Sequence, residues 1–247
     1  MKKTIKLTID YDGTNFAGWQ VQPNQRTVQG EIEHALETVL RHPVRTVGAG
    51  RTDTGVHASG QTAHFYTESD ITEHRLMGSL NGILPEDIAI REVKHVTDDF
   101  NARFDARARS YRYTIATKKV AINRHYSWMV PYNLDFDRLA KSTTALDGEC
   151  DIRGFSRGED SDDYRTIIFD NRWSHEGDFI YFDISAIRFF HHAVRSIVGT
   201  AVEVGRGKLP PGTVREILET RNRRLAGPTA PARGLCLMNI DYGDGET

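Results

Sequence analysis

The chain has 247 residues, of which 38% are hydrophobic and 27% are charged, and its formal net charge at pH 7 is −2. This length allows one large domain or two domains of ordinary size, and this composition is typical of soluble globular proteins. No apolar run approaches the roughly 18 residues that a membrane-spanning helix needs, which argues against an integral membrane protein.

The cysteines and the N-terminal segment indicate a cellular setting. Cys150 and Cys236 lie far apart in the sequence and match neither a disulfide framework nor a zinc motif. Residues 5–9 alternate between apolar and polar side chains instead of forming the apolar core of a signal peptide. We therefore expect a protein of the reducing cytoplasm with no membrane partner.

Basic residues gather in two stretches of this weakly acidic chain. Residues 99–124 hold seven Lys and Arg against two Asp and Glu, and residues 206–224 hold six against two. Phosphate groups respond to such local clusters more than to the net charge. A solvated face is an equally good interpretation of each stretch, and a compact acidic run at residues 159–163 opposes them.

The pattern of residues 3–96 predicts a ferredoxin-like half. Residues 3–10 alternate as a strand does, and Thr27 is placed to cap a helix that runs to about Arg41. The segments that follow read as two strands around a loop, a helix and a strand, at residues 44–50, 60–67, 73–84 and 87–96. This order is that of a ferredoxin-like fold, in which helices cover one face of an antiparallel sheet.

The same order returns in the second half of the chain. Strand patterns occupy residues 109–116, 166–175, 178–187 and 234–242, and helix patterns occupy residues 135–146, 190–204 and 213–220. We therefore predict an α+β protein with two ferredoxin-like (βαββαβ) halves, residues 1–107 and 108–247, and mainly antiparallel sheets. A cleft between the two halves would be a favoured place for a catalytic site.

Residues 11–22 read as a loop after the first strand, because they contain Asp-Gly and Gly-Trp pairs. Phe16, Trp19 and two glutamines in this loop could stack on a nucleic-acid base or bond to it. The two aromatic rings could equally plug the end of a sheet, and their chemistry alone does not choose between these roles.

Residues 48–58 bring three glycines, an arginine, an aspartate and a histidine into one loop between two strands. Glycine lets a backbone bend sharply and approach a ligand closely. Taken alone, the loop is a tight turn in which Asp53 bonds its own backbone and pairs with Arg51. The string RTDTGVH at residues 51–57, however, resembles the catalytic loop of the TruA family of tRNA pseudouridine synthases.

Further segments extend this resemblance over about residues 10–242. The family's segments that contain active-site residues match residues 106–113, 189–199 and 234–237 of this chain. The resemblance implies Asp53 as the catalytic nucleophile, with Tyr111, Arg195 and Leu235 as substrate-binding residues. It implies that Arg195 faces Asp53, and it makes Arg51 a candidate to fill the space left by a flipped base. Without the resemblance, Tyr111 would be a core side chain of its strand.

The family resemblance also implies a reaction and a substrate. The expected enzyme is an isomerase that converts uridine to pseudouridine at positions 38 to 40 in the anticodon arm of tRNA, with no cofactor and no metal. Family members are homodimers in which one tRNA contacts both subunits. Candidate phosphate contacts in the basic stretches are Arg107, Arg109, Arg112, Arg206 and Lys208. Whether Asp53 attacks the base ring or the sugar carbon stays open.

Three other functions compete with this one. A metal hydrolase could combine Asp53 with the histidines, but no HExxH-type spacing appears among His57, His64, His191 and His192. A non-catalytic RNA-binding module would present an RNP aromatic pattern on a central strand, and none is found. An interaction domain would use Asp53, Arg51 and Arg195 only as a structural ion pair.

Overall fold

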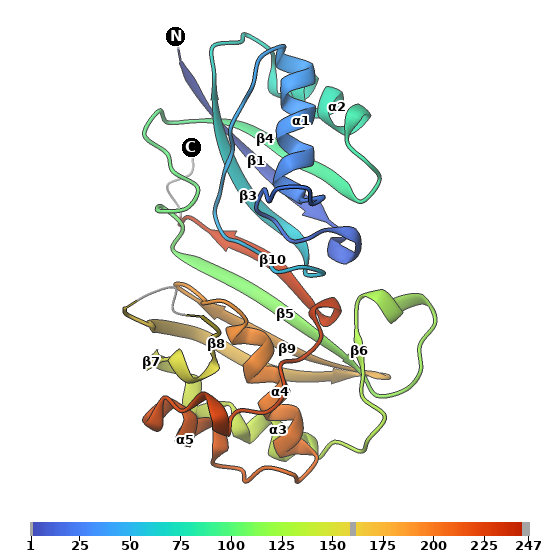
Figure 1. Ribbon diagram of the computed structural model, residues 1–247, viewed down its shortest axis with the longest axis vertical. Coiled ribbons are helices and arrows are strands. Elements are labelled where there is room, and N and C mark those ends of the chain that lie inside the picture. Colours follow the sequence, from blue (N-terminus) through green and yellow to red (C-terminus); the bar gives the residue numbers. More distant parts are fainter. Residues whose placement is uncertain (1, 159–161, 244–247) are drawn as a thin grey trace. The chain divides into compact units, whose positions relative to one another are not determined.

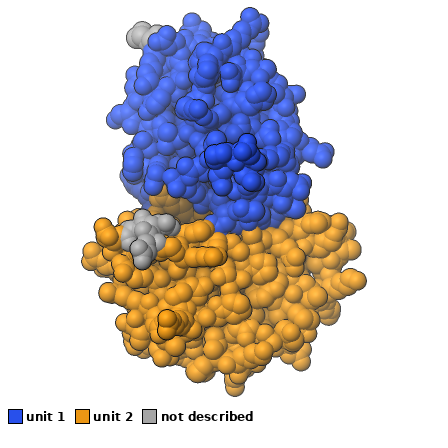
Figure 2. All heavy atoms as spheres, in the orientation of Figure 1, with its two compact units in different colours: residues 1–107, 237–247 blue, residues 108–236 orange. Residues whose placement is uncertain are grey.

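The computed structural model describes residues 2–158 and 162–243. The chain divides into two compact units, residues 1–107 with 237–247 and residues 108–236 (Figure 2). Part of the acidic run expected at residues 159–163 lies outside the described residues, because residues 159–161 fall between the two ranges.

The first unit has the predicted ferredoxin-like arrangement. Its elements are β1 (Lys3–Tyr11), α1 (Val28–Leu40), β2 (Val47–Gly48), β3 (His57–Thr67), α2 (Glu73–Ile83), β4 (Ile88–Val96) and most of β10 (Leu235–Asp241). The strands lie in the order β4-β1-β3-β10, with β2 also paired to β3, and β1 is antiparallel to both of its neighbours. Helices α1 and α2 cover one face of this sheet (Figure 1).

Local sequence signals place α1 and β1. The Thr27 side chain accepts a hydrogen bond from the backbone N–H of Gly30, so it caps α1 as predicted, and the helix ends at Arg41 in the left-handed conformation. In β1 the alternate side chains of Ile5, Leu7 and Ile9 are buried. The strand predicted at residues 44–50 is shorter than expected, because only Val47 and Gly48 pair with β3.

The face of the first sheet opposite the helices is also covered, by residues 97–107 and by Tyr242. His64 in β3 is only 1% exposed, and its Nδ1 accepts a hydrogen bond from the backbone N–H of Ala102 at 3.1 Å. Lys6 lies opposite His64 in the register, and its Nζ sits 6.0 Å from the ring centre of Phe100 and 5.4 Å from that of Tyr242. The Tyr242 hydroxyl donates to the carbonyl oxygen of Ala102 at 2.8 Å.

These contacts change the domain limits that we predicted. The expected second domain was residues 108–247, but residues 237–247 group with the first unit. The reason is that β10 is a neighbour of β3, and the backbone N–H of Arg107 donates to the carbonyl oxygen of Asp241 at 2.8 Å. A strand that is last in sequence thus completes the first unit's sheet.

The second unit repeats the layered arrangement. Its elements are β5 (Ala108–Ala116), β6 (Trp128–Met129), α3 (Phe136–Ser142), β7 (Gly148–Asp151), β8 (Arg165–Glu176), β9 (Phe179–Ala186), α4 (Ala193–Gly205) and α5 (Thr213–Thr220). The strands β5-β9-β8-β7 form an antiparallel series, and helices α3, α4 and α5 lie together on one side of it (Figure 1).

Two helices of this unit differ from the prediction. Helix α4 begins at Ala193 rather than at residue 190, because His192 has a φ of 63° and cannot continue a right-handed helix. The helix predicted at residues 135–146 is α3 followed by a separate 3-10 turn at Thr144–Leu146. In the described part of the chain, no helix combines the length and the apolar character that crossing a membrane requires.

Candidate active site

The loop that carries Asp53 runs from Ala49 to Val56 and leads directly into β3. Arg51 is exposed, Thr52 is buried at 7% exposure, and Asp53 is partly exposed. Gly55 has a φ of 76°, and the backbone N–H of Val56 donates to the carbonyl oxygen of Asp53 at 3.1 Å. The loop therefore turns sharply just after Asp53, while the residue before Asp53 is anchored in the interior.

The segment between β1 and α1 fixes this loop from behind. The Tyr11 hydroxyl and Thr52 Oγ1 lie 2.7 Å apart in a buried hydrogen bond. The backbone N–H of Trp19 donates to the carbonyl oxygen of Thr52 at 3.1 Å, and that of Gly55 donates to Phe16 at 3.4 Å. These three bonds hold the backbone on both sides of Asp53 against residues that are far away in sequence.

Glycines allow the two segments to approach each other this closely. A Cβ atom on Gly13 would lie 1.9 Å from the carbonyl oxygen of Val56, and one on Gly18 would lie 2.7 Å from that of Thr52. Gly18 also has a φ of 100°, which other residues rarely adopt. Phe16 and Trp19 are each 2% exposed, so they plug the unit, and the alternative in which their rings stack on a base is wrong.

Strand β3 holds the loop from the other side. Gln61 is fully buried, and its Nε2 donates to the carbonyl oxygen of Gly50 at 3.0 Å. Nδ1 of His57 accepts the backbone N–H of Gly13 at 3.1 Å. His57 and His64 therefore both use Nδ1 to accept a backbone N–H, and these nitrogen atoms are not available for a metal.

Sequence reasoning missed the supporting residues Tyr11, Thr52 and Gln61. A detectable signal existed only for Gln61, a large polar residue inside a strand of small and apolar residues. The alternative that we considered is formed only in part: the loop turns after Asp53, but Arg51 is not paired to Asp53. Within residues 2–158 and 162–243, the exposed Arg51 guanidinium has no carboxylate partner.

In the second unit, Tyr111 and Leu235 are the apolar candidates. Tyr111 lies in β5 opposite Ile184 of β9, and it is buried. Its ring meets that of Phe189 edge to face with centroids 5.4 Å apart. Leu235 is buried at the start of β10.

Arg195 lies in the first turn of α4, where residues 228–231 cross the helix. Its Nε donates to the carbonyl oxygen of Ala230 at 2.8 Å, and the backbone N–H of Ala230 donates back to the carbonyl oxygen of Arg195 at 3.0 Å. The buried Tyr113 donates its hydroxyl proton to Pro231 at 2.8 Å. Burial raises the pKa of Tyr113, and the nearby charge of Arg195 opposes that rise.

Gly199 lets the crossing segment lie against α4, since a Cβ there would be 1.8 Å from the carbonyl oxygen of Pro228. The guanidinium of Arg195 is thus oriented by the backbone of its own unit. That Arg195 faces Asp53, which belongs to the other unit, stays a prediction.

The five candidate phosphate contacts differ in the partners that they already have. Arg112 donates two hydrogen bonds to Asp183, at 2.7 and 2.9 Å, and this pairing raises its pKa. Arg206 bonds to the Glu203 carboxylate at 2.6 Å, and Arg109 donates to a carbonyl oxygen in the chain at 2.7 Å. An internal carboxylate competes with phosphate for Arg112 and Arg206.

The remaining two candidates, Arg107 and Lys208, have exposed side chains. Their backbone N–H groups bond to Asp241 and Glu203 respectively, and the guanidinium of Arg107 lies close to Gly243. Because both side chains are exposed, their charged ends are the more accessible members of this set.

A family model described as tRNA pseudouridine synthase matches residues 7–105 and 143–243, a span that includes Asp53, Arg195 and Leu235. The chain is 44% identical over 243 residues to tRNA pseudouridine synthase A of Moorella thermoacetica, covering 96% of this chain and 99% of the relative. It is 41% identical over 242 residues to the protein of that name from an Exiguobacterium species, covering 97% and 98%.

A third relative, tRNA pseudouridine synthase A of Bacillus licheniformis, is 41% identical over 244 residues, which cover 96% of this chain and 98% of the relative. Among solved structures, a complex of an archaeal box H/ACA ribonucleoprotein shares 10% identity with a TM-score of 0.35, over 80% of this chain and 44% of that chain. That likeness is too low to support an argument. The two matched ranges and these relatives show that the chain belongs to the tRNA pseudouridine synthase family.

Proposed function

We propose that this isomerase converts uridine to pseudouridine in the anticodon arm of tRNA, at positions 38 to 40, and that Asp53 is its nucleophile. One observation carries the proposal. Asp53 is partly exposed on a loop in which Thr52 and Val56 are buried and whose backbone is anchored to β3 and to residues 11–19. A reactive carboxylate needs this combination of access and fixed position.

The reaction is an internal rearrangement. The bond from uracil N1 to ribose C1′ breaks, and a bond from uracil C5 to C1′ forms. The proton on C5 leaves, and N1 gains a proton, so nothing is oxidised or hydrolysed. Asp53 would attack as a carboxylate anion, either at the ribose carbon or at the base ring, and then depart when the new carbon–carbon bond forms.

The other candidates have roles suited to their surroundings. Arg51 is exposed beside Asp53, so it is placed to occupy the space that a flipped uridine leaves in the RNA stem. Tyr111 and Leu235 would form an apolar surface against which the uracil ring packs. Arg195 would orient the Asp53 carboxylate, because a guanidinium favours and aligns an ionised carboxylate.

The remaining proposals concern the partners. The tRNA substrate follows from the names of the relatives, and Arg107 and Lys208 are the more accessible candidates for its phosphate groups. A homodimer that works in the cytoplasm follows from the family resemblance.

The test is a tritium-release assay on transcribed tRNA labelled at uridine C5. Wild-type protein should release tritium, since the C5 proton leaves only when the new carbon–carbon bond forms. Asp53→Asn should abolish release and keep tRNA binding, while Asp70→Asn, which changes an exposed carboxylate of the same unit, should leave release unchanged. Transcripts in which uridines 38, 39 and 40 are replaced one at a time would identify the modified position.

Two results would change the conclusion. Absence of release from every tRNA, with binding retained, would favour an RNA-binding module. Equal release by wild type and Asp53→Asn would keep the reaction and remove Asp53 from its centre.

A further inference from the structure

Arg223 is a partly buried arginine whose hydrogen bonds go to neutral groups. It begins the 3-10 turn Arg223–Leu225 after α5, and it is partly exposed. Its Nη2 donates to Ser196 Oγ and to Thr229 Oγ1, both at 3.1 Å. These two bonds use the hydrogens of Nη2, so within the described part of the chain the donors on Nε and Nη1 remain for another acceptor.

Arg223 differs in this respect from three other arginines of its unit. Arg221 pairs with Asp151 at 2.9 Å, Arg206 with Glu203 at 2.6 Å, and Arg165 with Asp163 at 3.0 Å. For Arg223, no carboxylate partner exists among residues 2–158 and 162–243. A partly buried charge without an opposite charge is unfavourable, and a site that binds an anion tolerates that cost when it is empty.

A second arginine adds to this positive charge. The pKa of the Arg223 guanidinium is lowered, mainly because the group is partly buried and to a smaller extent because of the charge of Arg157. The side chain of Arg157 is exposed, and its backbone N–H donates to the carbonyl oxygen of His191 at 2.9 Å, just before α4 begins. The backbone of Arg157 is thus attached just before α4, and the side chain of Arg223 is held by Ser196 of the same helix, so one arginine is anchored and the other is accessible to solvent.

The pair lies beside the candidate Arg195. Ser196, which accepts from Arg223, follows Arg195 in α4, and Thr229 precedes Ala230, whose carbonyl oxygen accepts from Arg195. The same two segments, the start of α4 and residues 229–230, thus position both arginines.

We infer that Arg157 and Arg223 form a subsite for a backbone phosphodiester of the substrate RNA, close to the nucleotide that undergoes reaction. Guanidinium groups match phosphate oxygens in geometry, and two of them held at the same end of α4 suit a group with a delocalised negative charge. The inference rests on the proposed function for the identity of the RNA, while the pair itself is defined by the contacts above.

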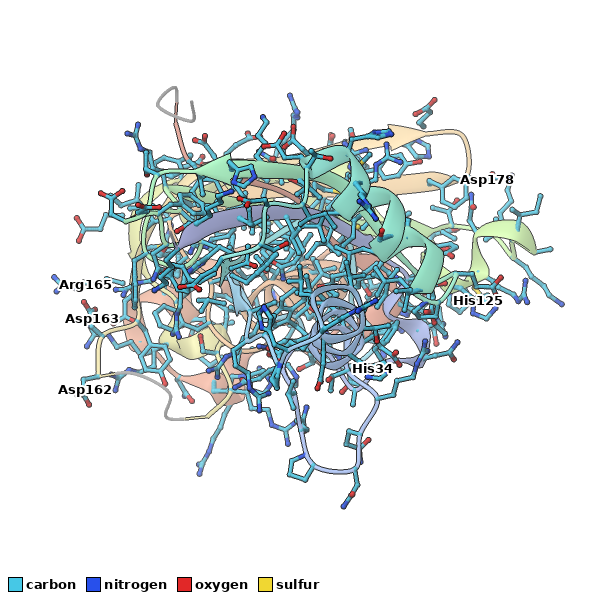
Figure 3. All side chains as sticks on the ribbon, turned by 90° about the horizontal axis from the view of Figure 1, so that it is seen from above. His34, His125, Asp162, Asp163, Arg165 and Asp178 are labelled. Atoms are coloured by element: carbon cyan, nitrogen blue, oxygen red, sulfur yellow. The ribbon has the colours of Figure 1, made fainter. Side chains whose placement is uncertain are left out.

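The experiment measures equilibrium binding of transcribed tRNA by fluorescence anisotropy over a series of salt concentrations. Arg157→Gln should weaken binding several-fold at low salt and reduce the slope of log K against log salt by about 0.7 to 0.9, the value for one phosphate contact. Arg165→Gln is the matched control, because this exposed arginine of the same unit is paired with Asp163 (Figure 3). It should leave both quantities unchanged.

A melting curve without RNA separates binding from stability. Arg157→Gln removes a like charge from Arg223, so its melting temperature should equal or exceed that of the wild type. Arg223→Gln also deletes the bonds to Ser196 and Thr229, and it should lower both the melting temperature and the salt slope. An unchanged salt slope in Arg157→Gln would overturn the subsite.

A carboxylate of the chain itself is the rival anion, since Glu159 and Asp160 follow Arg157 closely in sequence. If one of them neutralises the pair, Arg157→Gln and the double variant Glu159→Gln/Asp160→Asn should lower the melting temperature, and their effects should not add. That outcome would overturn the proposal. The binding experiment does not need turnover. If the wild type binds tRNA but releases no tritium, and Arg157→Gln still reduces the salt slope, the proposed function fails and the subsite stands.

Discussion

The buried hydrogen bond between Tyr11 and Thr52 is the most direct way to test whether the loop geometry controls the chemistry. The two oxygen atoms lie 2.7 Å apart. Tyr11→Phe removes one hydroxyl and keeps the ring, and it leaves Thr52 Oγ1 buried without that partner. Such a loss costs about 1–3 kcal/mol of folding free energy.

The effect on the rate should exceed a simple loss of stability. Thr52 and Asp53 are joined by a peptide bond, so a shift of Thr52 moves the reactive carboxylate. A misplacement of about 1 Å costs on the order of 100-fold in rate. We therefore expect Tyr11→Phe to lower kcat for tritium release by about tenfold or more, with KM for tRNA changed by less than about twofold.

Tyr242→Phe is the matched control for this prediction. The Tyr242 hydroxyl is also buried in the first unit, but it donates to the carbonyl oxygen of Ala102 at 2.8 Å, which lies outside the loop of residues 49–56. This variant should lose a similar amount of thermal stability and keep kcat. Thr52→Ser retains a hydroxyl and should recover much of the rate that Thr52→Val loses. Equal kcat in Tyr11→Phe and wild type at a temperature where both are folded would refute the reasoning.

Three further predictions concern the glycines, the second unit and the pH dependence of stability. Gly13→Ala would place its Cβ 1.9 Å from a backbone carbonyl oxygen, so we expect its melting temperature to fall by several degrees and its kcat to fall sharply. Gly82→Ala meets open space and should keep the melting temperature and kcat of the wild type. Arg195→Lys keeps the charge but loses the Nε bond to Ala230; kcat should fall by about tenfold or more while tRNA affinity, measured by anisotropy, is retained. Burial lowers the pKa of His64 below its ordinary 6.5, so the unfolded chain binds a proton that the folded chain does not. The stability that depends on neutral His64 is complete above about pH 6.5 and is lost as the pH falls towards the folded-state pKa. In melting curves from about pH 8 to about pH 5, His64→Gln should reduce this loss. An identical slope of melting temperature against pH in both proteins would contradict the prediction.

The elements that could be predicted have strong local signals. Thr27 marks the start of α1, and the helix predicted at residues 213–220 is α5 with those limits. β7 has no such signal, because its four residues form a strand only by pairing with β8. The place of residues 237–241 in the first unit's sheet is likewise set by a partner strand that is distant in sequence.

The candidate site divides in the same way. The string around Asp53 identifies the loop, because its residue types and spacing are specific. The groups that hold the loop are not visible in that string, since Tyr11 contacts Thr52 across 41 positions and Gln61 contacts Gly50 across 11. Tyr11 would pass for an ordinary strand residue until the fold shows what its hydroxyl reaches, and Gln61 stands out as a large polar residue without revealing that it bonds to Gly50.

The partners of the arginines explain how a chain with a net charge of −2 can bind a polyanion. Carboxylates neutralise Arg112 and Arg206, so these basic residues add little to the field that RNA meets. Arg223 is held by two hydroxyl groups instead, which fix its position and leave its charge uncompensated within the described residues. Neutral anchoring of this kind keeps an arginine's charge available for an anion, which counting Lys and Arg along the sequence cannot show.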